Sequence, residues 1–375
     1  MYYSPLIDDK EVEKMMHKEV VDTHRVTCEK QERLAVVTLN YPEKRNAIGK
    51  AMRDKILHHY REWVDNPDVY TILVESNHPE FFSAGADIIE ILEARERSLR
   101  DSIQLLGGEY ETIWTIDCMT KPVISLINGK VMGGGVGITQ HGTHIVAGEN
   151  YAWSMPEVKI GLFPDVGITR LLANMPGAIG MYLGLTGQAI NRDDARYLDL
   201  IEHSIDSDQF ENIKQQLREA IPVDRLLDDL TQKPGNSQLE ELEPLITKTF
   251  SQPTVEAIIT ALEEIRGEHQ PWAEAALEDM KAASPTSLKL TKLAIERMKG
   301  LPLEAALAQD FTLVGHCLKN HDFPHAINAR MREKTTPTWQ PDNLAAVSMD
   351  EIDEYFTPVV EDVLNLPPRE LGVDK

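Results

Sequence analysis

Two carboxylates, Glu157 and Asp165, are the residues of this sequence best suited to acid–base chemistry. They lie in the segment MPEVKIGLFPDVG, residues 155–167, which is rich in proline, glycine and apolar residues. A carboxyl group among apolar neighbours has a raised pKa, which suits it to act as a general acid or base near neutral pH. Spacing alone favours a structural role, in which Glu157 begins a helix after Pro156 and Asp165 caps the next turn, because most acidic residues lie at surfaces or caps.

A turn of small residues, SAGAD at residues 83–87, follows the aromatic pair Phe81-Phe82 and precedes an apolar helix pattern. Such a turn can present a backbone N–H group, here that of Ala86, to an oxygen atom of a ligand. The commoner alternative is a tight connection between strand and helix in which Asp87 is the cap. Spacing alone favours this second interpretation.

A glycine-rich turn, MGGGVG at residues 132–137, follows a predicted strand and its Asn128-Gly129 turn. Consecutive glycines lose much conformational entropy on folding, so some feature of the structure must require them. One such feature is the approach of a ligand to a helix N-terminus, where free N–H groups and the helix dipole favour negative charge. Another is close packing of the helix on the sheet, and the pattern does not decide between them. The turn is not a P-loop, because no Gly-Lys-Ser/Thr follows.

Strand patterns, several of them separated by helical stretches, fill the first half of the chain. The predicted strands are Leu34–Asn40, Tyr70–Glu75, Pro122–Ile127, His144–Ala147 and Tyr151–Ser154. Beyond about residue 205, helix patterns replace them, at Gln209–Ala220, Leu239–Phe250, Val255–Gly267, Trp272–Ala283 and Ser287–Lys299. We therefore predict an α/β fold with an acidic arm at residues 1–20, a core at 21–205 that holds the candidate site, and a mainly helical region at 206–375.

Charge and composition exclude several classes of function. The 375 residues carry 38 Lys and Arg against 61 Asp and Glu, a formal charge of −23, which argues against a nucleic-acid-binding surface. The longest uncharged run, residues 131–148, is too polar to cross a membrane. Widely spaced cysteines and the absence of a recognisable signal at the N-terminus predict a cytoplasmic protein. His141 and His144 have the spacing of metal ligands but lack a third, so a partly buried histidine pair is expected and no metal.

In their order along the chain, the three motifs resemble those of the crotonase (enoyl-CoA hydratase/isomerase) superfamily. The resemblance implies a spiral of ββα units, followed here by the helical C-terminal region, and an acyl-CoA thioester as the substrate. It also implies that the backbone N–H groups of Ala86 and Gly134 form an oxyanion hole for the thioester carbonyl. Such donors each contribute about 3–4 kcal/mol where negative charge develops on the oxygen.

Within the superfamily, the sequence resembles the branch of 3-hydroxyisobutyryl-CoA hydrolases, which release the acid and free CoA in valine catabolism. Enoyl-CoA hydratases typically carry a catalytic glutamate two residues after the third glycine, where this sequence has Gly137. The resemblance to the hydrolases extends over most of residues 30–360, through motifs such as HDF at 321–323. It therefore implies hydrolysis of a thioester rather than hydration of a double bond.

The same resemblance implies roles for individual residues. Glu157 and Asp165 are expected to be catalytic, and Glu109 and Gly134 are expected to contact the substrate together with them. No metal or redox cofactor is expected, because hydrogen bonds activate the thioester, and coenzyme A enters as part of the substrate. Relatives often assemble through their C-terminal helices, which makes a homo-oligomer a further expectation.

Two alternatives stay open at this point. An enoyl-CoA hydratase or isomerase would use Glu157 alone, with Asp165 in support, whereas a non-catalytic acyl-CoA-binding relative would turn over no thioester. Many superfamily members carry a basic residue shortly after the first turn, near the CoA, but this sequence has Ile88-Ile89-Glu90 there. Lys44 and Arg45 are the candidates to replace it.

Overall fold

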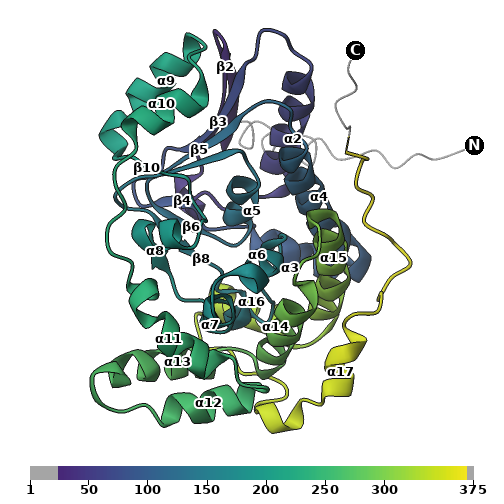
Figure 1. Ribbon diagram of the computed structural model, residues 1–375. Coiled ribbons are helices and arrows are strands. Elements are labelled where there is room, and N and C mark those ends of the chain that lie inside the picture. The colour runs from purple at the N-terminus through teal and green to yellow at the C-terminus, as the bar shows by residue number, and fades with distance from the viewer. Residues whose placement is uncertain (1–23, 370–375) are drawn as a thin grey trace, which may run out of the picture.

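The computed structural model describes residues 24–369, and the acidic arm predicted at residues 1–20 lies outside them. Its strands form two sheets, one with the order β1-β2-β3-β5-β7-β10 and one with the order β4-β6-β8-β9 (Figure 1). The larger sheet is parallel except for β1, and the smaller sheet is parallel except for β9. The strands are β1 (Val26–Gln31), β2 (Leu34–Leu39), β3 (Thr71–Ser76), β4 (Phe81–Ser83), β5 (Val123–Ile127), β6 (Lys130–Met132), β7 (His144–Ala147), β8 (Ala152–Ser154), β9 (Ile190–Asn191) and β10 (His203–Ser204).

Helices surround the sheets and predominate in the second half of the described chain. Those that alternate with the strands are α2 (Lys50–Val64), α3 (Ile88–Arg97), α4 (Leu99–Asp117), α5 (Gly134–Gln140), α6 (Ile168–Asn174), α7 (Ile179–Thr186) and α8 (Arg192–Tyr197). Those that follow are α9 (Phe210–Arg218), α10 (Val223–Leu230), α11 (Gln238–Phe250), α12 (Val255–Glu263), α13 (Gln270–Ala282), α14 (Pro285–Met298), α15 (Leu303–Lys319), α16 (Asp322–Ile327) and α17 (Met349–Glu354). The predicted α/β class and helical C-terminal region are therefore confirmed.

The larger sheet is buried on both faces, which explains why its parallel strands are almost continuously apolar. Side chains such as Val37 and Ile72 point into the main hydrophobic core. Their sequence neighbours Val36 and Leu73 point the opposite way and pack under α9 and α10, which cover that face (Figure 1). Side chains alternate between the two faces along each strand, and this alternation determines which side chains pack against the helices on each face of the sheet.

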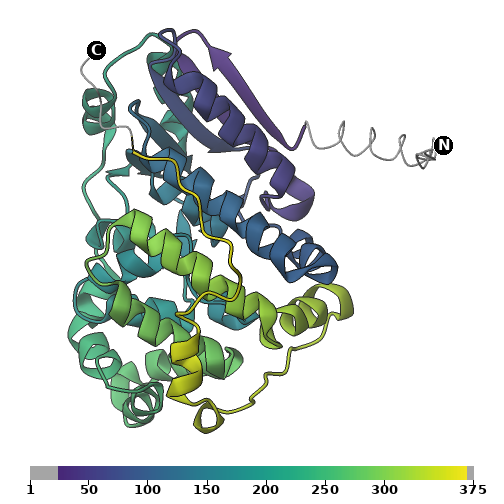
Figure 2. The same ribbon diagram turned by 90° about the vertical axis from the view of Figure 1, so that its right-hand side faces the viewer.

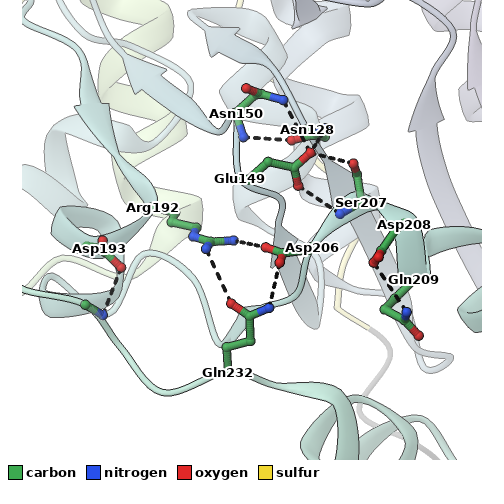
Figure 3. Close-up of polar contacts among 11 residues, drawn as sticks. Asn128, Glu149, Asn150, Arg192, Asp193, Asp206, Ser207, Asp208, Gln209 and Gln232 are labelled. Carbon is green, nitrogen blue, oxygen red and sulfur yellow. Dashed lines mark hydrogen bonds and ion pairs between the residues drawn. The ribbon is translucent and has the colours of Figure 1, made fainter.

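Hydrophobic packing is continuous across the domain boundary predicted near residue 205. The main core is a single cluster that includes strand residues such as Val123 together with Leu288 of α14 and Leu307 of α15. Polar contacts also join the two sides (Figure 3): Glu149 accepts hydrogen bonds from the amide and hydroxyl of Ser207, and Arg192 pairs with Asp206 at 2.7 Å. The division into a core and a separate helical region stays a prediction.

An extended C-terminal segment, residues 357–369, crosses α4 and α15 (Figure 2). Trp114 of α4 donates a 2.6 Å hydrogen bond to the carbonyl of Pro367, and Arg100 of the same helix pairs with Asp362. The segment therefore fastens the end of the described chain to a helix of the first half. None of the described helices is both long enough and apolar enough to cross a membrane.

Candidate active site

Two glycine-containing turns lie side by side because they follow neighbouring parallel strands. β4 leads into residues 84–87, and β6 leads into Gly133 and α5. A β-carbon built on Gly134 would lie 3.0 Å from the backbone nitrogen of Ala86. Neither of these two N–H groups has a hydrogen-bond acceptor among residues 24–369. The structure therefore brings Ala86 and Gly134 together with both amides unengaged.

A short strand-like contact supports the first turn. The amide of Ile48 donates to the carbonyl of Gly85 at 2.8 Å, and the amide of Asp87 donates to the carbonyl of Ile48 at 3.0 Å. Because backbone groups alternate in direction along a strand, these two bonds turn the intervening Ala86 amide away from Ile48. The Asp87 side chain accepts from the Glu90 amide at 3.3 Å and caps α3, as the commoner interpretation of this turn predicted.

Each of the three consecutive glycines, residues 133–135, permits a different close approach. A β-carbon on the first would lie 2.8 Å from Oε1 of Glu157, and one on the second would lie 2.0 Å from Oε1 of Glu109. A β-carbon on the third would lie 2.7 Å from the β-carbon of Ser83 in β4. The sequence left ligand approach and helix packing open as explanations. The packing explanation accounts for the third glycine, and the first two make room for carboxylates.

Glu157 begins a short 3-10 helix, Glu157–Ile160, directly after Pro156. Its side chain is buried, and its Oε2 atom has no hydrogen-bond partner in the described part of the chain. Burial raises its pKa well above the usual range, and the negative charges of Asp165 and Glu109 add to the effect. The helix start that spacing predicted is therefore present, and it holds a desolvated carboxyl group against Gly133.

Asp165 is also buried, but it has a hydrogen-bond donor. The hydroxyl of Tyr110 donates to its Oδ2 at 2.7 Å. Burial raises the pKa of Asp165 to about 6, although the Tyr110 hydrogen bond opposes this by stabilising the charged form. Asp165 can therefore ionise near neutral pH.

Glu109 lies beside Tyr110 on α4 and faces Gly134. Burial, and then the negative charge of Asp165, raise its pKa to about 8, and the positive charge of Arg53 works in the opposite direction. Arg53 of α2 is itself buried and donates to the carbonyl of Leu105 at 2.7 Å. Three carboxyl groups, on α4 and on the segment after β8, thus share one buried region, where burial is the first cause that raises the pKa of each above its usual range.

Other predicted residues have structural partners. Lys44 pairs with Asp87 at 2.5 Å, and Arg45 lies over the ring of Phe81, so both flank the first turn. Their contact with CoA phosphates stays a prediction.

The two histidines with metal-ligand spacing do not pair with each other. His141 is buried, with Nε2 2.9 Å from the carbonyl of Val166, whereas His144 stacks on His203 and approaches Asp224. No group of three or more candidate metal ligands occurs within residues 24–369.

Sequence patterns missed two polar residues of this region. One is Tyr110, whose only signal was its position next to Glu109. The other is Asp310 of α15, which is fully buried and accepts a 2.8 Å hydrogen bond from the Gly167 amide. An acidic residue in the apolar pattern ALAQDFTLVG, residues 306–315, was the available signal for Asp310.

Two adjacent turn amides that follow the parallel strands β4 and β6, beside a buried glutamate, are the arrangement expected of a crotonase-type site. A model of the enoyl-CoA hydratase/isomerase family matches residues 34–356, and the chain belongs to this family. The chain is similar to a carnitinyl-CoA dehydratase from Mycobacterium thermoresistibile, with a TM-score of 0.86 and 29% identity over 91% of this chain and 98% of that one. It is similar also to an enoyl-CoA hydratase from Rhodobacter sphaeroides 2.4.1, with a TM-score of 0.85 and 28% identity over 91% of this chain and all of that one. The predicted crotonase fold is confirmed.

Curated relatives narrow the resemblance. The chain is 32% identical to the mitochondrial 3-hydroxyisobutyryl-CoA hydrolase of Xenopus tropicalis over 86% of each protein. It is 30% identical to 3-hydroxyisobutyryl-CoA hydrolase 1 of Arabidopsis thaliana over 96% of this chain and 100% of the relative. The resemblance to the hydrolase branch, first noted in the motifs, therefore extends over nearly the whole chain.

Proposed function

We propose that the protein hydrolyses an acyl-CoA thioester, with 3-hydroxyisobutyryl-CoA as its substrate and 3-hydroxyisobutyrate and free CoA as its products. The observation that carries the proposal is the position of Glu157, a buried carboxyl group against Gly133, next to the adjacent amides of Ala86 and Gly134. The similarity to hydrolases of this substrate in Xenopus and Arabidopsis supports the choice of acyl group.

In the proposed mechanism the thioester oxygen binds between the N–H groups of Ala86 and Gly134. Glu157, in its ionised form, takes a proton from a water molecule whose oxygen attacks the carbonyl carbon, or attacks that carbon itself to give a mixed anhydride that water then hydrolyses. Negative charge develops on the carbonyl oxygen and is stabilised by the two amides. The C–S bond then breaks, and the thiolate of CoA takes up a proton, so that one water is consumed for each thioester.

Asp165 and Glu109 act on the same substrate. Asp165 orients the water or the substrate hydroxyl. It also exchanges a proton with Glu157, because the negative charge of Asp165 raises the pKa of Glu157 and so favours a state in which only one of the two is ionised. Glu109, which faces Gly134, binds the polar end of the acyl group. The shared protons make a donor available for the leaving thiolate without a metal ion, and coenzyme A is needed only as part of the substrate.

The environment of Gly137 supports hydrolysis over hydration. A β-carbon at this position would lie 2.9 Å from Ile113 and 3.0 Å from Val166, so a glutamate has no room there without repacking. Hydratases of the superfamily typically place their first catalytic glutamate at this point. The likeness to an enoyl-CoA hydratase of known structure keeps hydration by Glu157 as the second candidate function.

A thiol-release assay over a panel of acyl-CoAs tests the proposal. We expect free thiol from 3-hydroxyisobutyryl-CoA and no loss of the double-bond absorbance of crotonyl-CoA. The opposite pattern would establish the hydratase. Tight binding of every acyl-CoA with turnover of none would establish a non-catalytic binding protein. Single turnover in 18O-labelled water then distinguishes the two mechanisms, because only the anhydride route places label in Glu157.

Two further proposals concern the setting of the reaction. We expect the protein to work in the cytoplasm, although several relatives carry the word mitochondrial in their names. We also expect a homo-oligomer. Fractionation of cells and light scattering of the purified protein test these two expectations.

A further inference from the structure

A strained turn directly follows Asp165. Val166 has a φ of +53° and Gly167 a φ of +75°, so two successive residues occupy the left-handed region. Glycine tolerates this conformation, whereas a β-branched residue there is a genuine outlier. Strain of this kind costs free energy and persists only where the surrounding structure holds the backbone in place, often at functional sites.

Two side chains hold the peptide group between Val166 and Gly167 from both ends. His141, at the end of α5, lies with Nε2 2.9 Å from the carbonyl oxygen of Val166. Asp310 of α15 accepts the Gly167 amide hydrogen at 2.8 Å through Oδ2. A flip of this peptide would break both hydrogen bonds at once, so the pair fixes the plane of the peptide.

The chemistry of each side chain fits this task. His141 is buried, and burial lowers its pKa to about 4, so the ring is neutral and its Nε2 must carry the hydrogen that the carbonyl accepts. Asp310 is fully buried, and burial and the negative charge of Asp165 raise its pKa well above the usual range. Its Oδ1 atom has no partner within residues 24–369. Burial therefore disfavours a charge on either side chain behind Asp165.

We propose that His141 and Asp310 are positioning residues for Asp165, which they orient through the 166–167 peptide group. The proposal rests on the role given to Asp165 above. The backbone that leaves Asp165 passes directly into the held peptide, while its carboxyl group must reach the Tyr110 hydroxyl at 2.7 Å. A turn free to relax its strain at Val166 would move that carboxyl group. The helical C-terminal region thereby contributes to the candidate site through α15.

Paired substitutions separate positioning from simple packing. Asp310→Asn keeps a hydrogen-bond acceptor of the same shape, whereas Asp310→Leu removes the acceptor at similar volume. We expect Asp310→Leu to lower kcat by about 10²-fold, as for displacement of a catalytic group by about 1 Å, with KM within about twofold of the wild type. Asp310→Asn should recover most of kcat. His141→Gln, which keeps a donor, and His141→Leu should repeat the pattern.

Leu318→Ala is the matched control, because Leu318 is fully buried two turns farther along α15. It should lower Tm without the specific loss of kcat. If Asp310→Leu and Leu318→Ala lower Tm alike and both leave kcat at the wild-type value, the positioning role is overturned.

Hydrogen exchange separates this inference from the proposed function. If the wild type hydrolyses no thioester, the proposed function fails, but the effect of Asp310 on the mobility of the 166–167 peptide group can still be measured. Faster hydrogen exchange of residues 163–168 in Asp310→Leu, with protection retained in Asp310→Asn, would support the proposal that Asp310 fixes the 166–167 peptide group. Equal exchange in the two variants would overturn it.

Discussion

The hydroxyl of Tyr110 donates a 2.7 Å hydrogen bond to the carboxyl group of Asp165, which lies 55 residues further along the chain. The bond ties α4 to the segment after β8 at the point where the candidate catalytic groups meet. Tyr110 and Glu109 are neighbours on α4, so one helix supplies both a hydrogen-bond donor for one buried carboxyl group and the next carboxyl group. Through these two residues α4 modifies the ionisation of the cluster, of which burial is the largest cause.

Tyr110→Phe removes the donor and should raise the pKa of Asp165 above its value of about 6, because the hydrogen bond stabilises the charged form. If Asp165 works ionised, the low-pH limb of kcat/KM moves to higher pH. One hydrogen bond of about 1 kcal/mol corresponds to a shift of roughly 0.7 pH units. The measurement is a pH–rate profile, with Tyr182→Phe as the control, because the hydroxyl of Tyr182 bonds Gln188 instead. An unmoved limb would remove Tyr110 from this role.

Glu157→Gln keeps the volume of the side chain and removes its ability to act as a base or nucleophile. We expect kcat for thiol release to fall by at least about 10²-fold, the usual contribution of a general base, with little change in acyl-CoA binding. Steady-state kinetics and calorimetric titration with a substrate analogue measure the two effects. Turnover near the wild-type rate would show that another group performs the step.

Gly134→Ala should block the space beside the two amides. The new β-carbon would lie 2.0 Å from Glu109 and 3.0 Å from the Ala86 nitrogen, so the carboxyl group must move or the methyl group must occupy the oxyanion position. Loss of the oxyanion contacts is expected to lower kcat by about 10²–10³-fold. Gly315→Ala on α15 is the control, because its new methyl group meets only an ordinary contact at 3.4 Å from Ile103. Circular dichroism of both variants shows whether the fold is kept.

Glu109→Gln should stabilise the protein, increasingly so at higher pH. The pKa of Glu109 is raised from 4.5 to about 8 in the folded state, so the folded protein binds this proton more tightly than the unfolded chain. The stabilisation is complete below about pH 4.5 and is lost as the pH rises through about 8. Glutamine does not titrate, and the Tm of the variant should therefore gain on the wild type across this interval. Glu93→Gln, at an exposed glutamate of α3, is the control and should show no such gain.

Much of the central fold follows from local patterns. The predicted strands at Leu34–Asn40, Tyr70–Glu75 and Pro122–Ile127 match β2, β3 and β5 to within two residues at either end, because buried parallel strands are continuous apolar runs. The helix predicted at Ser287–Lys299 corresponds to α14, which begins at Pro285 because the Ser284 side chain accepts from the Ser287 amide and caps it. By contrast, the three-residue strands β4 and β6 were not predicted, because they run directly into the turns of small residues that dominate the pattern there, whereas the equally short β8 was predicted at Tyr151–Ser154.

The candidate site was predictable only in part. The glycine turns and Glu157 have short-range signals, and the structure brings Ala86, Gly134 and Glu157 to one place. The roles assigned to these residues stay predictions. The contacts of Asp310 could not be foreseen, because its partner Gly167 lies 143 residues away and no local pattern encodes a pairing at that distance.

The continuity of the hydrophobic core across residue 205 has a consequence for biosynthesis. A ribosome that has delivered only the strand-rich half has made a polypeptide whose apolar surfaces still await α14 and α15. The hydrogen bond from the Gly167 amide to Asp310 also cannot form until α15 has been synthesised. Such an intermediate would be both inactive and prone to aggregate, so enzymatic competence should emerge only near the end of translation.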